Sequence, residues 1–314
     1  MIAPGTKPIP FQFEQEKRDD IISRDTDWGE NGIGQFTFYR TYSRKKDNGK
    51  METWNECVLR VIEGMFTILK THIIMSGLEW REDKAQELAF NAADRLFKFQ
   101  WTPPGRGLWM MGTDFVWEKG GAALNNCGFV STENIEEEFS EPFRFLMDMS
   151  MLGVGIGFDT LDTKGADKIT VRRPQGEPKT FVVPDTREGW VNAIGTLIDS
   201  YLKPNQLPVV LDTSQVRPYG KPIRGFGGVA SGPCPLEPGF YGIKDVLENR
   251  AGEKLSSVDI TDIQNIIGKI VVAGNVRRTA EIAFASPRDK DFRTMKSWKD
   301  NPVAVGAAPP EELK

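Results

Sequence analysis

Two stretches of the sequence decide the fold of this chain: LNNCGFV at 124–130 and GVGIGFD at 153–159. Both end in apolar residues with the composition of short strands. Residues 135–151 between them have the pattern of a helix that is interrupted near Pro142. A strand, a helix and a second strand in this order build parallel sheets, so the sequence predicts an α/β fold with a largely parallel sheet.

Toward the carboxyl end the alternation of strands and helices continues. We expect strands at 181–183, 208–212 and 281–284, and helices at 185–201, 240–250 and 259–273. The first of these helices opens with Asp185-Thr186-Arg187-Glu188, a capping box of the Asp-x-x-Glu kind. The stretch 217–239 is dominated by glycine and proline and predicts a long ordered loop.

Toward the amino end the pattern becomes mainly helical. Residues 1–35 are polar and rich in turn formers, so we expect them on the surface, and the alternation at 36–42 predicts a strand. Apolar residues at helical spacing predict amphipathic helices at 52–75 and 82–98. The segment TPPGRG at 102–107 then breaks the pattern, so we expect a helical region at 1–103 and a second domain at 104–314.

The composition is that of a globular protein, with 39% hydrophobic and 27% charged residues among 314. A formal net charge of −4 argues against direct nucleic-acid binding and against anionic membranes. We find no apolar run long enough to span a membrane and no signal-peptide core, so we expect the cytoplasm. The single histidine, His72, excludes a histidine-based metal cluster and a Ser/His triad, and we predict no metal site.

The three cysteines differ in their surroundings. Cys57 lies on the apolar face of a helix and is interpreted as a buried, inert thiol, and Cys234 as a structural residue in a turn. Cys127 stands at the start of a strand near a sheet end, where ligand sites of α/β folds gather. Its residues alone leave two readings open: a structural thiol, or a redox cysteine that needs a second cysteine within reach.

Glycines and arginines are the other candidates for a binding site. The run Gly153-x-Gly155-x-Gly157 fits tight packing, a dinucleotide-binding turn, or a backbone that a substrate approaches closely. Several arginines lie beside glycine or proline, namely Arg172, Arg173, Arg217, Arg224, Arg277 and Arg278. They are either solvated surface charges or guanidinium groups that bind a polyphosphate, near which Asp185 could accept a hydrogen bond from a ribose hydroxyl.

Taken together, these segments resemble the amino-terminal half of the adenosylcobalamin-dependent ribonucleoside-triphosphate reductases, the monomeric class II type. The resemblance rests on LNNCGFV, the glycine strand, the loop RPYGKPIRGFGGVASGP at 217–233 and the stretch VVAGNVRRTAEIA at 271–283. It implies the first half of a ten-stranded α/β barrel, preceded by a helical region. It also implies an inserted effector-binding subdomain at about 161–216.

The resemblance assigns roles to individual residues. Cys127 matches the redox-active cysteine that reduces the ribose, and Asn126 and Gly155 match positions at the substrate. The effector-binding residues it implies are Asp185, Arg187, Arg217 and Arg224. The specificity loop it implies contains Gly274, Asn275, Arg277 and Arg278.

The resemblance also implies what this chain needs from elsewhere. The family's thiyl-radical cysteine lies in an Asn-Pro-Cys-x-Glu loop, and the nearest string here, at 301–303, has valine at that place. We therefore expect ribonucleoside triphosphates to be reduced only with a carboxy-terminal half supplied as a separate chain. That half would bind most of the adenosylcobalamin, with a thioredoxin-like reductant and a deoxynucleoside triphosphate (dNTP) effector as further partners. A truncated or interrupted reading frame is the alternative that the sequence leaves open.

Two other functions remain open. The chain could be a non-catalytic nucleotide-binding remnant that senses dNTPs, because it has the arginine loops and lacks the radical cysteine. A nicotinamide-dependent oxidoreductase built on the 153–157 glycine run is the third hypothesis.

Overall fold

The computed structural model describes residues 5–46, 48–160, 169–221, 229–273 and 279–297. The chain divides into two compact units, Met1–Asn126 and Cys127–Lys314. The 102–107 segment, where we expected the chain to divide, lies inside the first unit. Among the described residues, no helix is long and apolar enough to cross a membrane.

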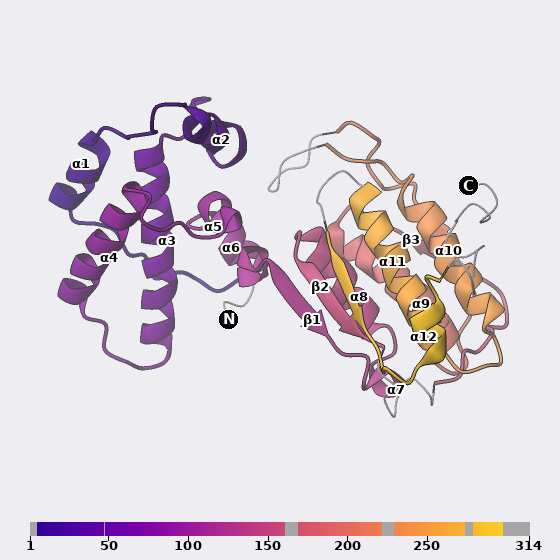
Figure 1. Cartoon of the computed structure of the whole chain (residues 1–314). Coiled ribbons are helices and arrows are strands. Elements are labelled where there is room, and N and C mark those ends of the chain that lie inside the picture. Colours follow the sequence, from indigo (N-terminus) through magenta and orange to yellow (C-terminus); the bar gives the residue numbers. More distant parts are fainter. Residues whose placement is uncertain (1–4, 47, 161–168, 222–228, 274–278, 298–314) are drawn as a thin grey trace. The chain divides into compact units, whose positions relative to one another are not determined.

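The first unit is helical (Figure 1). Its elements are α1 (Gln15–Ser23), α2 (Ile33–Thr41), α3 (Trp54–Met75), α4 (Glu82–Phe97), α5 (Gly105–Met110), α6 (Asp114–Lys119) and the 3-10 turn η1 (Gly121–Leu124). The two long helices confirm the amphipathic helices expected at 52–75 and 82–98. A reciprocal capping box starts α3: the Thr53 hydroxyl accepts from the Glu56 amide, and the Glu56 carboxylate accepts from the Thr53 amide.

Two predictions for this unit were wrong. Residues 36–42 belong to the helix α2, because Phe38 is needed in the core, where its ring meets Trp28 and Trp54, while Phe36 stays exposed. Tertiary packing of one aromatic ring thus overrides the local alternation. We expected residues 1–35 to cover the surface, but within 5–35 the helix α1 and the irregular segment before it bury apolar side chains: Phe11, Phe13 and Ile21.

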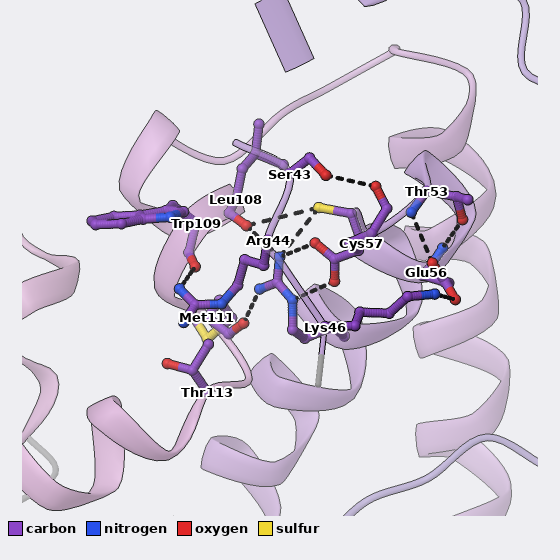
Figure 2. Close-up of polar contacts among 12 residues, drawn as sticks. Ser43, Arg44, Lys46, Thr53, Glu56, Cys57, Leu108, Trp109, Met111 and Thr113 are labelled. Carbon is purple, nitrogen blue, oxygen red and sulfur yellow. Dashed lines mark hydrogen bonds and ion pairs between the residues drawn. The ribbon is translucent and has the colours of Figure 1, made fainter. Parts of the chain in front are cut away.

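A buried ion pair joins α5 to α3. The Arg60 guanidinium donates to both carboxylate oxygens of Glu52, at 2.7 and 2.8 Å, and to the carbonyl oxygens of Leu108 and Met111. Beside it, the Arg44 guanidinium donates to the carbonyl of Trp109 at 2.9 Å (Figure 2). These bonds satisfy carbonyl groups of α5 and of the turn that follows it.

Cys57 lies against this ion pair, and its thiol donates to the Leu108 carbonyl at 3.7 Å (Figure 2). The side chain is fully buried, and burial raises the pKa of the thiol to about 12. A thiol that stays protonated at neutral pH is a poor nucleophile, which confirms that Cys57 is inert.

The second unit contains a three-stranded sheet in the order β1-β2-β5, with β1 at Cys127–Val130, β2 at Gly155–Asp159 and β5 at Glu281–Phe284. Both pairings are parallel, which confirms the predicted architecture. A second parallel pair joins β3 (Lys179–Val182) to β4 (Val209–Asp212). The helices are α7 (Ile135–Glu138), α8 (Glu141–Met151), α9 (Arg187–Leu202), α10 (Leu236–Asn249), α11 (Ser257–Ala273) and α12 (Lys290–Thr294).

Among the described residues of the second unit, helices cover one face of the sheet. Helix α8 packs against β1 and β2 and also against α9 and α11. Ile156 and Phe158 of β2 are buried, whereas Phe129 and Ile282 of the flanking strands are more than half exposed. The expected break near Pro142 is confirmed: the backbone of Phe139 turns to φ +51° between α7 and α8, and Pro142 occupies the first turn of α8.

The Arg60–Glu52 pair provides the first test of this fold. We expect Glu52→Gln to destabilise the first unit by about 1.5–3 kcal/mol, because it replaces the charge-assisted hydrogen bonds of a partly buried guanidinium with neutral ones. Denaturant unfolding followed by circular dichroism and tryptophan fluorescence measures the change. The matched control is Asp83→Asn, whose partner Arg81 is exposed, and a surface pair contributes less than about 1 kcal/mol. Equal losses in the two variants would contradict the structural role of the pair.

Candidate functional site

Cys127 and Gly155 are direct neighbours in the parallel register of β1 and β2. Cys127 is exposed, and so is Asn126 before it. Both strands begin here, so the residues lie at the edge formed by the amino ends of the strands. Ligand sites of α/β sheets usually gather at the opposite, carboxyl edge. Our argument that Cys127 lies where ligand sites gather was therefore wrong.

On the face of the sheet that carries Cys127 and Phe129, the central strand β2 has glycines in place of larger side chains. Gly157 stands between Phe129 of β1 and Ile282 of β5 in the register. A Cβ atom added to Gly157 would lie 2.9 Å from the Phe129 ring and 3.3 Å from the Ile282 side chain. Gly157 is buried between these side chains, whereas Gly155 is only partly buried and leaves backbone accessible beside Cys127. A substrate could approach the sheet closely at Gly155.

The glycine run does not have the geometry of a dinucleotide-binding turn. That motif needs a strand, then the glycines, then the amino end of a helix. Here Gly153, at φ +80°, forms the turn that follows helix α8, and Gly155 and Gly157 lie within β2. The order is helix to strand, so no helix amino end faces a phosphate at this run.

A second polar cluster forms where α9 begins. The Arg217 guanidinium donates to the Asp185 carboxylate at 2.6 Å, and both side chains are about one third exposed. Asp185 does not cap the helix as predicted. The cap is Thr186, whose hydroxyl accepts from the Gly189 amide at 2.9 Å, because Thr186 is the residue directly before the first helical turn.

The structure thus brings together two of the predicted effector residues, Asp185 and Arg217. A third, Arg187, lies in the first turn of α9 and forms ion pairs with Asp148 at 3.3 Å and Glu188 at 3.1 Å. The fourth, Arg224, lies outside the described residues, as do the predicted specificity-loop residues Gly274, Asn275, Arg277 and Arg278.

The chain on either side of 222–228 is held together by backbone hydrogen bonds. The Gly220 amide donates to the Ala230 carbonyl at 2.9 Å, and the Ala230 amide donates to the Lys221 carbonyl at 2.7 Å. Two other arginines already serve the fold: Arg172 donates to the Leu202 carbonyl, and Arg173 pairs with Glu248. Arg172 and Arg173 therefore have partners that stabilise the fold, whereas Arg217 remains a candidate phosphate ligand.

Sequence reasoning missed Glu281. Both of its carboxylate oxygens are shielded from solvent and have no hydrogen-bond partner among the described residues. One oxygen occupies the space over Gly268 of α11, where a Cβ would come within 1.9 Å. Burial raises the pKa of this carboxyl to about 7. A glutamate inside an apolar strand was the available signal.

The described residues do not form a metal site or a set of cobalt ligands. Within these ranges no group of three or more His, Cys, Asp and Glu side chains could hold a metal ion. The only histidine of the sequence, His72, is exposed on α3.

Comparison with known proteins gives first the class of this protein. A model of the ribonucleotide reductase alpha domain matches residues 18–113. A model of the insertion domain of B12-dependent ribonucleotide reductase matches residues 159–247. A crystal structure of a B12-dependent (class II) ribonucleotide reductase superposes with a TM-score of 0.79 at 30% identity, over 94% of this chain and 47% of that chain.

Curated relatives agree. The adenosylcobalamin-dependent ribonucleoside-triphosphate reductase of Euglena gracilis is 43% identical over 88% of this chain and 38% of its own length. The probable enzyme of that name from Dictyostelium discoideum is 40% identical over 93% of this chain and 40% of its own length. The chain belongs to this family of reductases and spans about two fifths of the length of these relatives.

The insertion domain is longer than we predicted. Its match at 159–247 covers the expected region at 161–216 and extends through the 217–232 loop into α10. The cluster of Asp185 and Arg217 therefore lies wholly within the insertion domain.

Glu281 leads to a prediction about pH. Its pKa in an unfolded chain is about 4.5 and in the folded chain about 7, so the folded state holds the proton more tightly. The stability of the second unit should therefore be fully present below about pH 4.5 and should decrease as pH rises toward 7, by on the order of 2 kcal/mol. Glu281→Gln should remove this part of the decrease in unfolding experiments between pH 5 and 8.

Glu133→Gln is the matched control, because Glu133 is exposed in a loop of the same unit. It should keep the decrease of the wild type. A Glu281→Gln protein with the full wild-type pH dependence would show that the carboxyl is solvated in the folded chain.

Proposed function

We propose that this chain contributes a reducing cysteine and an effector site to the reduction of ribonucleoside triphosphates to 2′-deoxyribonucleotides. The observation that carries this proposal is the pairing of an exposed Cys127 with the bare backbone of Gly155. The names of the relatives support the reaction and the substrate class. Asn126, exposed beside Cys127, is proposed to contact the substrate together with Gly155.

In the proposed reaction the ribose 2′-hydroxyl leaves as water and two thiols are oxidised to a disulfide. Cys127 provides one thiol. We propose that the second comes from beyond this chain, as the resemblance to the family implies: Cys57 is buried, and Cys234 is interpreted as a structural residue in a turn. Adenosylcobalamin, held by residues beyond this chain, supplies the radical that starts the reaction. A thioredoxin-like dithiol then reduces the disulfide for the next turnover.

A dNTP effector is proposed to bind at Asp185 and Arg217. The triphosphate would compete with the Asp185 carboxylate for the Arg217 guanidinium, because both anions accept its paired donors. Asp185 would then be free to accept a hydrogen bond from the sugar hydroxyl. Arg224 is proposed as a further phosphate ligand, and the stretch with Gly274, Asn275, Arg277 and Arg278 as the specificity loop.

One observation favours a second candidate function. The Asp185–Arg217 pair forms between residues of this chain, within the match to the insertion domain. A non-catalytic protein that senses dNTPs would need only this cluster.

The role of Cys127 is tested by complementation. The carboxy-terminal part of a relative, supplied as a second polypeptide with adenosylcobalamin and a dithiol, should restore reduction with the wild-type chain. Cys127→Ser should abolish multiple turnovers while leaving the fold intact, because serine cannot form the disulfide. Cys234→Ser is the control, since Cys234 is also exposed, and it should retain turnover. Normal turnover by Cys127→Ser would make Cys127 structural.

The effector site is tested by calorimetry with dNTPs. Arg217→Ala and Arg224→Ala should each weaken binding by about 1.5–3 kcal/mol, the size of a charge-assisted hydrogen bond. Arg277→Ala should leave affinity nearly unchanged and alter which base is reduced, because a specificity loop couples two sites. Arg173→Ala, which removes a surface ion pair with Glu248, should not change affinity. Equal losses in all four variants would contradict the assignment.

A further inference from the structure

Arg187 connects α9 to α8. Its guanidinium lies 3.3 Å from the Asp148 carboxylate, and the two side chains are only 22% and 27% exposed. The Nη1 atom that makes this contact is shielded from solvent and has no aligned hydrogen-bond acceptor among the described residues. The interaction is therefore an electrostatic one between partly buried charges, in which solvent screening is weaker than at the surface.

Asp148 lies in the last turn of α8, and this turn runs directly into the candidate site. The Gly153 amide donates to the Ser150 carbonyl at 2.7 Å, and the Val154 amide donates to the Met149 carbonyl at 3.0 Å. These two bonds close the helix end and set the direction in which Gly155 leaves it.

The same turn holds the start of β5. The Thr279 hydroxyl lies 3.1 Å from the hydroxyl of the buried Ser150 and 3.4 Å from the Val154 carbonyl. The Ile156 amide donates to the Ala280 carbonyl at 2.9 Å. A displacement of the last turn of α8 would therefore move both the central strand and the residues that lead into β5.

The other end of α8 is held independently. The Arg144 guanidinium donates to Ser140 at 2.8 Å and to Asn192 at 2.7 Å, and lies 3.4 Å from Asp199. It fits against Gly195 of α9, where a Cβ would come within 2.0 Å of the guanidinium. The first turn of α8 is thus fixed to α9 by several contacts, whereas the Arg187–Asp148 pair ties its last turn to the start of α9.

We propose that Arg187 and Asp148 are positioning residues that transmit the state of the Asp185–Arg217 cluster to the Cys127–Gly155 edge. The proposal rests on the proposed function, because it assumes that a nucleotide binds at this cluster. A triphosphate that draws Arg217 away from Asp185 changes the segment that leads into α9, two residues before Arg187. The shift reaches Asp148 through the ion pair, then Gly155 through the helix end, and Cys127 through the strand register.

Hydrogen exchange of the Val154 and Ile156 amides measures the ordering of this edge in the whole chain. Arg187→Gln and Asp148→Asn should each speed their exchange about fivefold, the effect of losing one partly buried ion pair. Arg187→Lys, which keeps the charge, should restore the wild-type rate to within about twofold. The effects of the two changes should be less than additive in the double variant, because each single variant already breaks the Arg187–Asp148 pair.

Two controls separate this local effect from general loss of stability. Arg173→Gln removes a different ion pair of the same unit and should leave both rates unchanged. The buried amides of α11 should exchange at the wild-type rate in every variant. Unchanged Val154 and Ile156 rates in Arg187→Gln, or additive effects in the double variant, would overturn the proposal.

A second arm uses 2′-deoxyadenosine triphosphate as the probe. In the wild type, saturating nucleotide should change the exchange of Val154 and Ile156 by at least about twofold. In Asp148→Asn, which leaves every predicted effector residue in place, it should bind without that change. Nucleotide that binds and changes both proteins equally would overturn the coupling. Absence of calorimetric binding to the wild type would remove the effector site instead, while the first arm still decides whether Arg187 and Asp148 position the edge.

Discussion

The second unit depends on the burial of one face of a short parallel sheet. Ile156 and Phe158 are each 1% exposed, and burying a side chain of this size contributes about 1.5–3 kcal/mol. Because side chains alternate along a strand, placing these two on the helix side puts Gly155 and Gly157 on the open side. A slip of one residue would reverse both faces, so the packing of the core determines where the candidate site lies.

The two units differ in whether a charged side chain away from solvent has hydrogen-bond partners. Arg60 in the first unit meets two carboxylate oxygens and two carbonyls, so its charge is fully paired and joins α5 to α3. Glu281 in the second unit has no hydrogen-bond partner among the described residues and stays protonated up to about neutral pH. Such a local conflict with good packing is expected near functional sites, and Glu281 lies at the same strand edge as Cys127 and Gly155.

The position of the insertion domain in the chain explains why helix packing matters. Its match begins at residue 159, where β2 ends, and β5 follows it in the sequence but pairs directly with β2. The insertion therefore leaves and returns to neighbouring strands of one sheet. Its helix α9 contacts α8, which lies against that sheet (Figure 1). A change within the insertion can reach the strands through this contact, through the packing of α10 on α11 and of α11 on β5, or through the chain itself.

The sequence by itself determined the strands and the longer helices of the second unit, the burial of Cys57 and the family, but not the short helix α12 or the start of α10 at Leu236. These follow from local periodicity, from apolar neighbours along one helix and from long motifs. The helix at 33–41 was not predicted from the sequence, because the packing of Phe38 against Trp28 and Trp54 outweighs the strand-like alternation of its neighbours.

Only the tertiary structure decided the polar partners. Arg217 pairs with Asp185 across 32 residues, and Arg187 turns to Asp148 on another helix. Thr186 caps helix α9, where the pattern had predicted Asp185. A carboxylate oxygen of Glu281 lies over Gly268. Charged side chains at such separations meet only where helix packing brings them together. That packing is set by buried apolar surface summed over whole elements, which no local pattern of charged residues records.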